Sequence, residues 1–396
     1  MNRFYLIVPI GLEDLALEEL KKASVDLQFI FDEKAVLHDI ITSMGGIEFN
    51  IDFHVGLLLN HILKIPSRVL LRWEQFKAKD FPTLSKKLNS LKWNQTVFQN
   101  GIGELVISAS RSKLNNEKRI KKVLVEEVFK IQNISYDKTD EPDLYLRMHD
   151  DLLQLSIDTT GEHLHFRGYR ENQGEAPLRE NFAAALWFFL IKDLGLSELT
   201  NFTLIDPLCG SGTLLFESFL FEKNQLFRRF SLDHLIPQDM YKKILKNQLL
   251  REKNTTDCSY FGFDNNSKVI MSAIANKIKI QSKYQHIDFN FDVTDLFSDT
   301  KFKTMDKINK NIFLICNPPY GDRLKLKEGM NILDYCKKAL DKFQPHRAAF
   351  ILPAHAEILK YQNISNYKKT DQLGFSNNGI RVVFQKYTKD GVVGGE

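Results

Sequence analysis

The sequence predicts an α/β protein in which a smaller α+β unit precedes a doubly wound parallel sheet. From about residue 176 onward, apolar strands and helical segments alternate along the chain, which is typical of a parallel sheet with helices on both faces. The first 53 residues instead show short strand-like stretches around glycines and one helical segment. With 396 residues the chain is too long for one ordinary core, so two or three domains are expected.

Composition and local hydrophobicity exclude several protein classes. Hydrophobic residues make up 43% and charged residues 26% of the chain, as in soluble globular proteins. The most apolar stretch, 182–191, is too short to span a bilayer, and the apolar run 4–8 leads directly into acidic residues, unlike a signal peptide. The four cysteines lack the spacing of disulfide or zinc sites. We therefore expect a cytoplasmic protein with no membrane segment and no metal.

The beginning of the chain predicts a small α+β unit. Residues 4–9 have the pattern of a strand, and Gly11 opens a segment whose apolar residues recur at helical spacing. Acidic residues crowd the first turns of that segment, where the helix dipole favours them. Two further extended segments are predicted at 27–31 and 47–53.

A basic region follows. Residues 64–130 hold 15 Lys and Arg against six Asp and Glu, although the net charge of the whole chain is only +4. A strand at 106–108 leads into a basic turn and then a helix over about 117–130, and basic side chains beside a helix start favour phosphate. A solvated lysine-rich surface explains the charge alone equally well. The predicted RNA-binding residues are Arg111, Lys113, Lys118, Arg119, Lys121 and Lys122.

The second half of the chain is introduced by a polar connection. A hairpin is predicted from 144–147 and 152–158, and the glycine-punctuated stretch after it has the composition of an interdomain linker. Pro177 then starts a strongly apolar helix. No role is predicted for the polar helical segment 227–256.

A glycine turn follows the first strand of the predicted parallel sheet. Residues 202–217 run from an apolar strand through Gly210 and Gly212 into a helix. Open α/β sheets bind ligands at this carboxyl edge, and the glycines would let the backbone approach a ligand closely. A P-loop is disfavoured because no Gly-Lys-Ser/Thr ending is present, and Leu215 replaces the third glycine of a dinucleotide fingerprint.

Carboxylates end three successive strands. Asp206 could face a cationic centre, Asp264 could accept the hydroxyls of an unphosphorylated ribose, and Asp292 could accept an adenine amino group. Each aspartate alone is a common turn or cap residue. Together with the glycine turn they fit S-adenosylmethionine, which carries the reactive methyl group itself. The predicted cofactor-binding residues are Asp206, Pro207, Gly210, Ser211, Gly212, Thr213, Asp264, Asn265, Asp292 and Asn317.

The stretch Asn317-Pro318-Pro319-Tyr320 stops an apolar strand. Two prolines remove two backbone donors, so the strand cannot continue and its last carbonyls need other partners. Pro-Pro alone favours a plain turn, but beside the carboxylates these four residues are the predicted catalytic set. The Asn317 side-chain oxygen and the Pro318 carbonyl would each accept an N–H of a planar amine, while the Tyr320 ring covers the attached base. This would be catalysis by orientation.

Several short motifs occur together along the chain. They are Gly11-Leu12-Glu13 with Glu19-Leu20, Ser110 to Leu114, Asp158 to Gly161, Arg167 to Arg170, Ala176 to Glu180, Asp206 to Thr213, Asn317 to Gly321 and Asn378-Gly379. By these motifs the chain resembles the bacterial THUMP-domain-containing guanine-N2 methyltransferases of 23S ribosomal RNA, in the single-methyltransferase form. The resemblance implies a ferredoxin-like element at 1–50, a THUMP RNA-binding domain at 51–157, a linker at 158–175, and a Rossmann-like class I methyltransferase domain with seven strands at 176–396. Asp322 departs from the Glu that is usual in this family.

The same resemblance implies methyl transfer from S-adenosylmethionine to the exocyclic N2 amino group of a guanine in structured RNA, with 23S ribosomal RNA or its precursor as the expected partner. Methylation of tRNA guanine, of DNA adenine N6 or of a release-factor glutamine stays open. A non-catalytic RNA-binding ribosome-assembly factor is disfavoured by the intact pocket residues. An oxidoreductase is disfavoured by the poor dinucleotide fingerprint.

Overall fold

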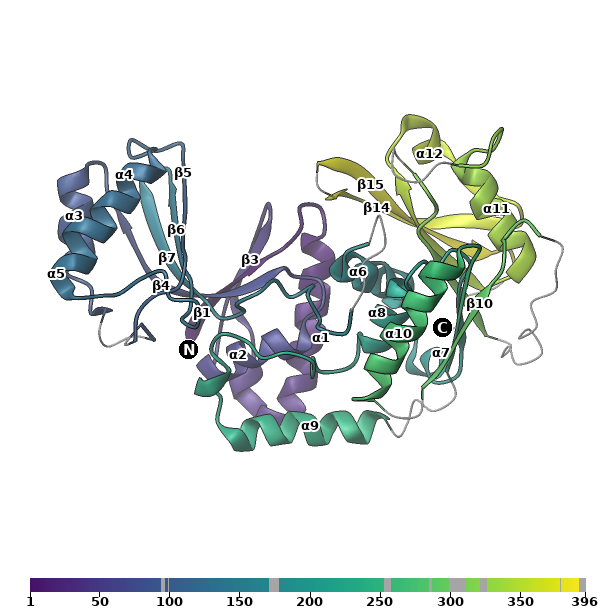
Figure 1. Cartoon of the computed structure of the whole chain (residues 1–396), viewed down its shortest axis with the longest axis horizontal. Coiled ribbons are helices and arrows are strands. Elements are labelled where there is room, and N and C mark those ends of the chain that lie inside the picture. Colours follow the sequence, from purple (N-terminus) through teal and green to yellow (C-terminus); the bar gives the residue numbers. More distant parts are fainter. Residues whose placement is uncertain are drawn as a thin grey trace.

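Two β-sheets, one from each half of the chain, lie side by side along the longest axis of the molecule (Figure 1). The computed structural model describes residues 1–93, 97–98, 100–170, 178–252, 258–284, 287–298, 311–320, 326–377 and 379–391. Gly321, Asp322, Asn378 and residues 171–177 and 253–256, which figured in the sequence predictions, lie outside this set.

The N-terminal sheet has seven strands in the order β2-β3-β1-β4-β7-β6-β5, and only β5 and β6 run parallel. Because β4 pairs with both β1 and β7, this sheet is continuous across residue 50. The strands are β1 (Asn2–Ile7), β2 (His38–Ser43), β3 (Gly46–Ile51), β4 (Arg68–Lys77), β5 (Leu105–Ser110), β6 (Leu144–His149) and β7 (Leu152–Asp158). The predicted hairpin is confirmed as β6 and β7.

Two groups of helices accompany this sheet. α1 (Glu13–Phe31), the short 3-10 helix Asp32–Ala35 and α2 (Phe53–Ile62) lie near β1 and β3, toward the middle of the molecule (Figure 1). α3 (Phe81–Asn89) and α4 (Glu117–Lys122) lie at the far end, where α4 continues through the π-helical turns Val123–Phe129 into α5 (Lys130–Gln132). The extended segment predicted at 27–31 is wrong. Leu27 and Phe31 continue the buried stripe of α1 begun by Leu20 and Ala23, so the helical periodicity extends to the end of that stretch.

The C-terminal sheet has the order β10-β9-β8-β11-β12-β15-β14-β13. The first five strands are parallel, and β15 runs antiparallel to them. β14 pairs antiparallel with β15 and so has the same direction as the first five. Seven of its strands form the predicted doubly wound sheet, which confirms the fold class, and the two-residue β13 extends one edge. The strands are β8 (Thr203–Asp206), β9 (Ser259–Asp264), β10 (Asp288–Val293), β11 (Ile312–Cys316), β12 (Arg347–Pro353), β13 (Asn363–Ile364), β14 (Tyr367–Asn377) and β15 (Ile380–Lys389).

Alternate residues of the central strands face two different cores. Leu204 and Phe313 pack in the cluster that includes α6, α8 and the N-terminal half, whereas Ile205 and Leu314 pack with α11 on the other face. The helices are α6 (Glu180–Ile191), α7 (Leu196–Leu199), α8 (Thr213–Leu220), the 3-10 turn Asp233–Leu235, α9 (Gln238–Glu252), α10 (Ser267–Gln281), α11 (Ile332–Phe343) and α12 (Ala356–Lys360). No described helix is both long and apolar enough to cross a bilayer.

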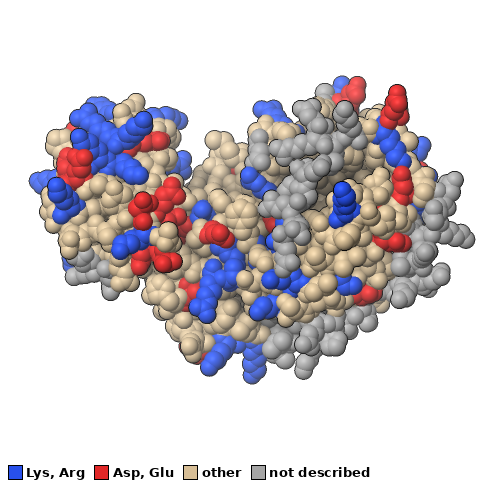
Figure 2. Space-filling model, viewed as in Figure 1, with Lys and Arg blue, Asp and Glu red and all other residues tan. Residues whose placement is uncertain are grey.

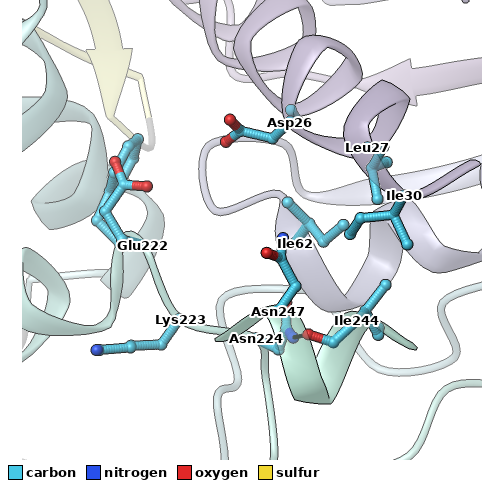
Figure 3. A pocket seen from close by; sticks show the side chains of 11 residues that line it. Asp26, Leu27, Ile30, Ile62, Glu222, Lys223, Asn224, Ile244 and Asn247 are labelled. Atoms are coloured by element: carbon cyan, nitrogen blue, oxygen red, sulfur yellow. Dashed lines mark hydrogen bonds between the residues drawn. The ribbon is translucent and has the colours of Figure 1, made fainter. Parts of the chain in front are cut away.

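The segment between α8 and β9 joins the two halves of the molecule. α9 runs beneath both halves in Figure 1, and Asp233 Oδ1 lies 2.8 Å from Nε2 of the buried His61 on α2. Arg228 donates to the carbonyls of Thr160, Glu162, His163 and Phe166 in the connecting stretch. Figure 3 shows a pocket at this junction, lined by side chains of α1, α2 and the 221–247 stretch; none is a predicted site residue. The polar segment that lacked a predicted role is therefore a contact between the halves.

Candidate functional site

The glycine turn lies between the end of β8 and the start of α8. Gly210 and Gly212 have φ of 52° and 84°, a left-handed conformation that favours glycine. A Cβ on Gly212 would lie 2.6 Å from the Phe216 ring, whereas a Cβ on Gly210 would meet no atom within 4 Å. Gly212 is thus required by packing, and Gly210 borders open space. The turn is also tied to the next strand, since Cys209 N donates to the Phe263 carbonyl at 2.8 Å.

Asp264, the last residue of β9, supports this turn. Its Oδ2 accepts from Gly210 N at 3.0 Å, and its Oδ1 accepts from Asn266 N at 2.9 Å. Burial raises the pKa of this carboxyl, while the backbone N–H groups that donate to it oppose the shift. Each oxygen still has a lone pair for a further donor. The neighbouring Asn265 is exposed.

Asp206, at the end of β8, is almost completely buried, with 1% of its surface exposed. Its Oδ1 accepts from Leu208 N at 3.1 Å, and it forms no ion pair with any described residue. Its pKa is raised to about 8, chiefly by burial; the Leu208 N–H opposes the shift and the nearby charge of Asp264 adds to it. Among the described residues, no counter-charge faces this carboxyl group. Pro207, which follows it, is buried.

Asn317 follows β11, the strand that pairs with β8 through Leu314 and Ile205. Its side-chain Oδ1 is buried and has no hydrogen-bond partner among the described residues. A buried acceptor without a donor is costly, so it marks a place where a ligand can donate. Pro318 is buried and Pro319 partly so. Burial raises the pKa of the Tyr320 hydroxyl, and a side-chain hydrogen bond with Asn377 on β14 opposes the shift.

The thiols of Cys209 and Cys316 lie within this same buried region. Burial raises the pKa of each well above its ordinary value, and the Asp206 charge adds to both shifts. Thiols in this environment stay protonated and are poor nucleophiles. The shared influence of Asp206 also shows that the ends of β8 and β11 adjoin.

Asp292 lies differently from the other two aspartates. It pairs with Phe263, while Asp264 is level with Val293, so Asp292 is the penultimate residue of β10 and not its end. Its side chain is partly exposed. The structure thus brings Asp206, Asp264, the glycine turn and Asn317 to one edge of the sheet, and Asp292 lies one residue further inside it.

Two partners of the turn were missed by the sequence predictions. Asn276 on α10 donates through Nδ2 to the Ser211 carbonyl at 3.2 Å, and Arg170 donates through Nη2 to Thr213 Oγ1 at 2.7 Å. Arg170 belongs to a motif that carried the family resemblance but was placed in the linker. Its distance of 43 residues from Thr213 left no local signal for this contact.

The predicted RNA-binding residues gather at the opposite end of the molecule. All six are exposed, and Figure 2 shows Lys and Arg concentrated over the end that carries α3 and α4. Their contacts within the protein are the weak ion pairs and ring contacts that are typical of surface side chains. Arg111 pairs with Asp150 at 3.2 Å, Lys122 pairs with Glu126 at 3.7 Å, and the Arg119 guanidinium lies 4.0 Å from the centre of the Phe81 ring.

Comparison with curated proteins places the chain among methyltransferases. It is 26% identical over 343 residues to the putative RNA methyltransferase slr0064 of Synechocystis, covering 83% of this chain and 82% of that one. It is 25% identical over 390 residues to the ribosomal RNA large subunit methyltransferase K/L of Colwellia psychrerythraea. That match covers 93% of this chain but 50% of the K/L protein, so the chain spans about half the length of that relative.

A solved structure has the same fold over nearly the whole chain. SMU.472, a putative methyltransferase complexed with SAH, superposes with a TM-score of 0.74 and 19% identity, covering 99% of both chains. The family model of RMKL-like methyltransferase domains, UPF0020, matches residues 167–374. This match confirms the resemblance to methyltransferases of this kind. The chain belongs to the UPF0020 family of RMKL-like methyltransferase domains.

Proposed function

We propose that the protein transfers a methyl group from S-adenosylmethionine to the exocyclic N2 amino group of a guanine in RNA, with 23S ribosomal RNA or its precursor as the substrate. The observation that carries this proposal is the buried Oδ1 of Asn317, which has no hydrogen-bond partner in the described part of the chain and lies next to the strand that ends in Asp206. An acceptor enclosed in this way selects a ligand with a donor, and an exocyclic amine supplies one.

The residues at the edge of the sheet suit S-adenosylmethionine, which supplies an activated methyl group on a positively charged sulfur. Asp206 offers a buried carboxyl group that forms no ion pair with the residues the structure describes. Asp264 keeps lone pairs for two ribose hydroxyls, and the space beside Gly210 allows close approach. Asp292, Asn265 and the backbone of Ser211 would complete the contacts. The relative SMU.472 was solved with SAH, the product of such a reaction.

The chain's own contribution to the reaction is orientation. The Asn317 Oδ1 and the Pro318 carbonyl would each accept one N–H of the amine, which directs the nitrogen lone pair toward the methyl group. The Pro318-Pro319 pair restrains the backbone here, and with it the Pro318 carbonyl, since neither proline can rotate about φ. The Tyr320 ring would cover one face of the base. No basic side chain is needed before attack, because the proton leaves after the new bond forms.

RNA as substrate is supported by the exposed basic residues and by the relatives named as RNA methyltransferases. In this proposal residues 1–50 form a ferredoxin-like element, 51–157 the THUMP domain, 158–175 the linker, and 176–396 the methyltransferase domain. Arg111, Lys113, Lys118, Arg119, Lys121 and Lys122 would hold RNA phosphates. The reaction would then take place in the bacterial cytoplasm. A guanine within an RNA helix would have to unstack and flip out to enter the pocket.

Methyl transfer can be tested with labelled S-adenosylmethionine and three substrates: ribosomal RNA from cells lacking the protein, tRNA, and DNA. We expect label in N2-methylguanosine of 23S RNA. Label in tRNA guanosine or in DNA N6-methyladenine would redirect the substrate assignment while retaining the chemistry. RNA binding without methyl transfer to any of the three substrates would show that the protein is a non-catalytic assembly factor.

A further inference from the structure

Two arginines of the connecting stretch, Arg167 and Arg170, bind one helix of the catalytic half. Arg167 Nε lies 3.1 Å from Glu217 Oε2, and Arg170 Nη2 lies 2.7 Å from Thr213 Oγ1. Thr213 and Glu217 are four residues apart on α8, so they lie on the same side of that helix. The two arginines, three residues apart, therefore hold α8 at two successive turns.

The contact between Arg167 and Glu217 also reaches the N-terminal half. Arg167 is 2% exposed and Glu217 0% exposed. Arg167 Nη2 donates to the Lys64 carbonyl at 2.8 Å, and Nη1 donates to the Leu164 carbonyl at 2.6 Å. Lys64 follows α2, and its own backbone N–H donates to the buried carboxylate of Glu19 on α1 at 2.7 Å. One continuous chain of hydrogen bonds thus runs from α1 and α2 to α8.

Arg170 extends this chain to the glycine turn. Thr213 is the first residue of α8 and directly follows Gly212, whose positive φ sets the direction of the helix. Arg170 also donates to the Leu178 carbonyl at 3.0 Å, and its Nε lies 3.2 Å from Glu180 Oε1 on α6. The planar guanidinium can reach these partners together because its donors point in fixed directions. The turn is consequently attached to α6 and to the connecting stretch as well as to its own strand.

We infer that Arg167 and Arg170 are positioning residues that hold the glycine turn in its ligand-binding shape and tie that shape to the N-terminal half. They act through Thr213 and Glu217, without touching the reacting atoms. The ligand part of this inference rests on the proposed function, in which the turn holds S-adenosylmethionine.

The test uses four full-length proteins: the wild type, Thr213→Val, Arg170→Lys and the double variant. Valine keeps the shape of threonine and removes the hydroxyl acceptor. Lysine keeps a cation beside Glu180 but lacks the Nη2 group that donates to Thr213. Ser218→Ala is the matched control, because it removes a hydroxyl of α8 whose one hydrogen bond among the described residues stays within the helix, to the Leu214 carbonyl at 2.7 Å. Arg167 is not replaced, since an unpaired buried Glu217 would endanger folding.

The first readout is amide hydrogen exchange of the 206–216 segment in ligand-free protein, which requires no activity. We expect exchange about fivefold faster in each single variant, no further increase in the double variant, and wild-type exchange in Ser218→Ala. Unchanged exchange in Thr213→Val and Arg170→Lys, or fully additive effects, would overturn the inference.

The second readout is the Kd for S-adenosylhomocysteine by calorimetry. The same pattern is expected, with affinity about fivefold weaker in both single variants and in the double variant. A wild-type protein that does not bind S-adenosylhomocysteine would overturn the proposed function, while the exchange measurement would still decide whether the arginines hold the turn.

Discussion

The basic end near α4 and the edge of the C-terminal sheet are two candidate binding surfaces built in opposite ways. The first is a set of exposed cations whose intramolecular pairs, such as Lys122 with Glu126, are open to water. The second contains the buried carboxyl group of Asp206 and the buried Oδ1 of Asn317. Among the described residues, Asp206 has no ion-pair partner and the Asn317 Oδ1 has no hydrogen-bond partner. An exposed charge gains little from one contact, whereas a buried polar group gains much from the correct ligand.

This difference predicts how each region responds to substitution. Single changes at the sheet edge should have large and specific effects, because each removes a group with no substitute. Single changes at the basic end should have small effects that accumulate and depend on salt.

Asn317→Ala should cause the largest loss. We expect methyl transfer to fall by about a thousandfold or more, since removal of one positioned polar group from a catalytic site typically costs a factor of 10² to 10³ or greater. S-Adenosylhomocysteine should bind with nearly unchanged affinity, because the proposed role of Asn317 Oδ1 concerns the acceptor amine. The measurements are single-turnover transfer and calorimetry.

Asn311→Ala serves as the control for that variant. Asn311 precedes the same strand, and its Nδ2 donates to the Glu198 carbonyl at 3.0 Å, away from the sheet edge. It should retain most of its activity. Asn317→Ala with activity near that of Asn311→Ala would remove Asn317 from the mechanism.

Asp206→Asn should weaken cofactor binding by roughly ten- to a hundredfold, because it removes the only charge proposed to face the sulfonium while keeping the shape of the side chain. The effect is smaller than for Asn317→Ala because the turn and Asp264 still contribute to binding. Calorimetry with S-adenosylmethionine gives the Kd. Equal affinity for variant and wild type would show that the sulfonium does not lie beside Asp206.

The same substitution should raise the stability of the ligand-free protein at high pH. The folded-state pKa of Asp206 is raised to about 8 from an ordinary value of 3.8, so folding favours the protonated carboxyl. Its contribution to stability is present below the ordinary value and is lost as pH rises through about 8. The Tm advantage of Asp206→Asn should therefore grow between pH 5 and pH 8 and then level off. An advantage independent of pH would contradict the burial of an ionisable group here.

Substitutions at the basic end should have the smallest individual effects. Lys118→Ala and Lys121→Ala should each weaken RNA binding only a few fold, and the combined variant should lower the slope of log K against log salt by about one to two. Cofactor affinity and Tm should stay at wild-type values, because both side chains are exposed. Filter binding at several salt concentrations measures the slope.

Lys337→Ala is a control on the catalytic half, where an exposed lysine of α11 lies outside the basic end. It should leave the salt slope unchanged. If it matches Lys118→Ala, RNA contacts are spread over the whole surface and the basic end has no special role.

Much of the catalytic half could be predicted from local sequence. Strand ends are marked by Asp206, Asp264 and Asn317 in chain order, and parallel strands bring their carboxyl ends to one edge, so the approximate meeting of these residues follows from topology alone. The end of the strand at Cys316 was also predictable, from the two prolines that follow Asn317.

Other features depended on distant parts of the chain. The strand predicted at 27–31 was wrong because a short apolar segment fits either period, and only packing on the sheet selects the helix. The role of the 227–252 segment emerged from Arg228 and Asp233, whose partners lie 62 to 172 residues away.

The sequence by itself thus determined the fold class, the position of the glycine turn and the identity of the residues at the sheet edge, because these depend on local periodicity and on residues with restricted backbones. Only the tertiary structure decided which polar groups are buried without a partner and which arginines hold α8. Burial and long-range pairing depend on how the two halves pack together, and no local pattern encodes that arrangement.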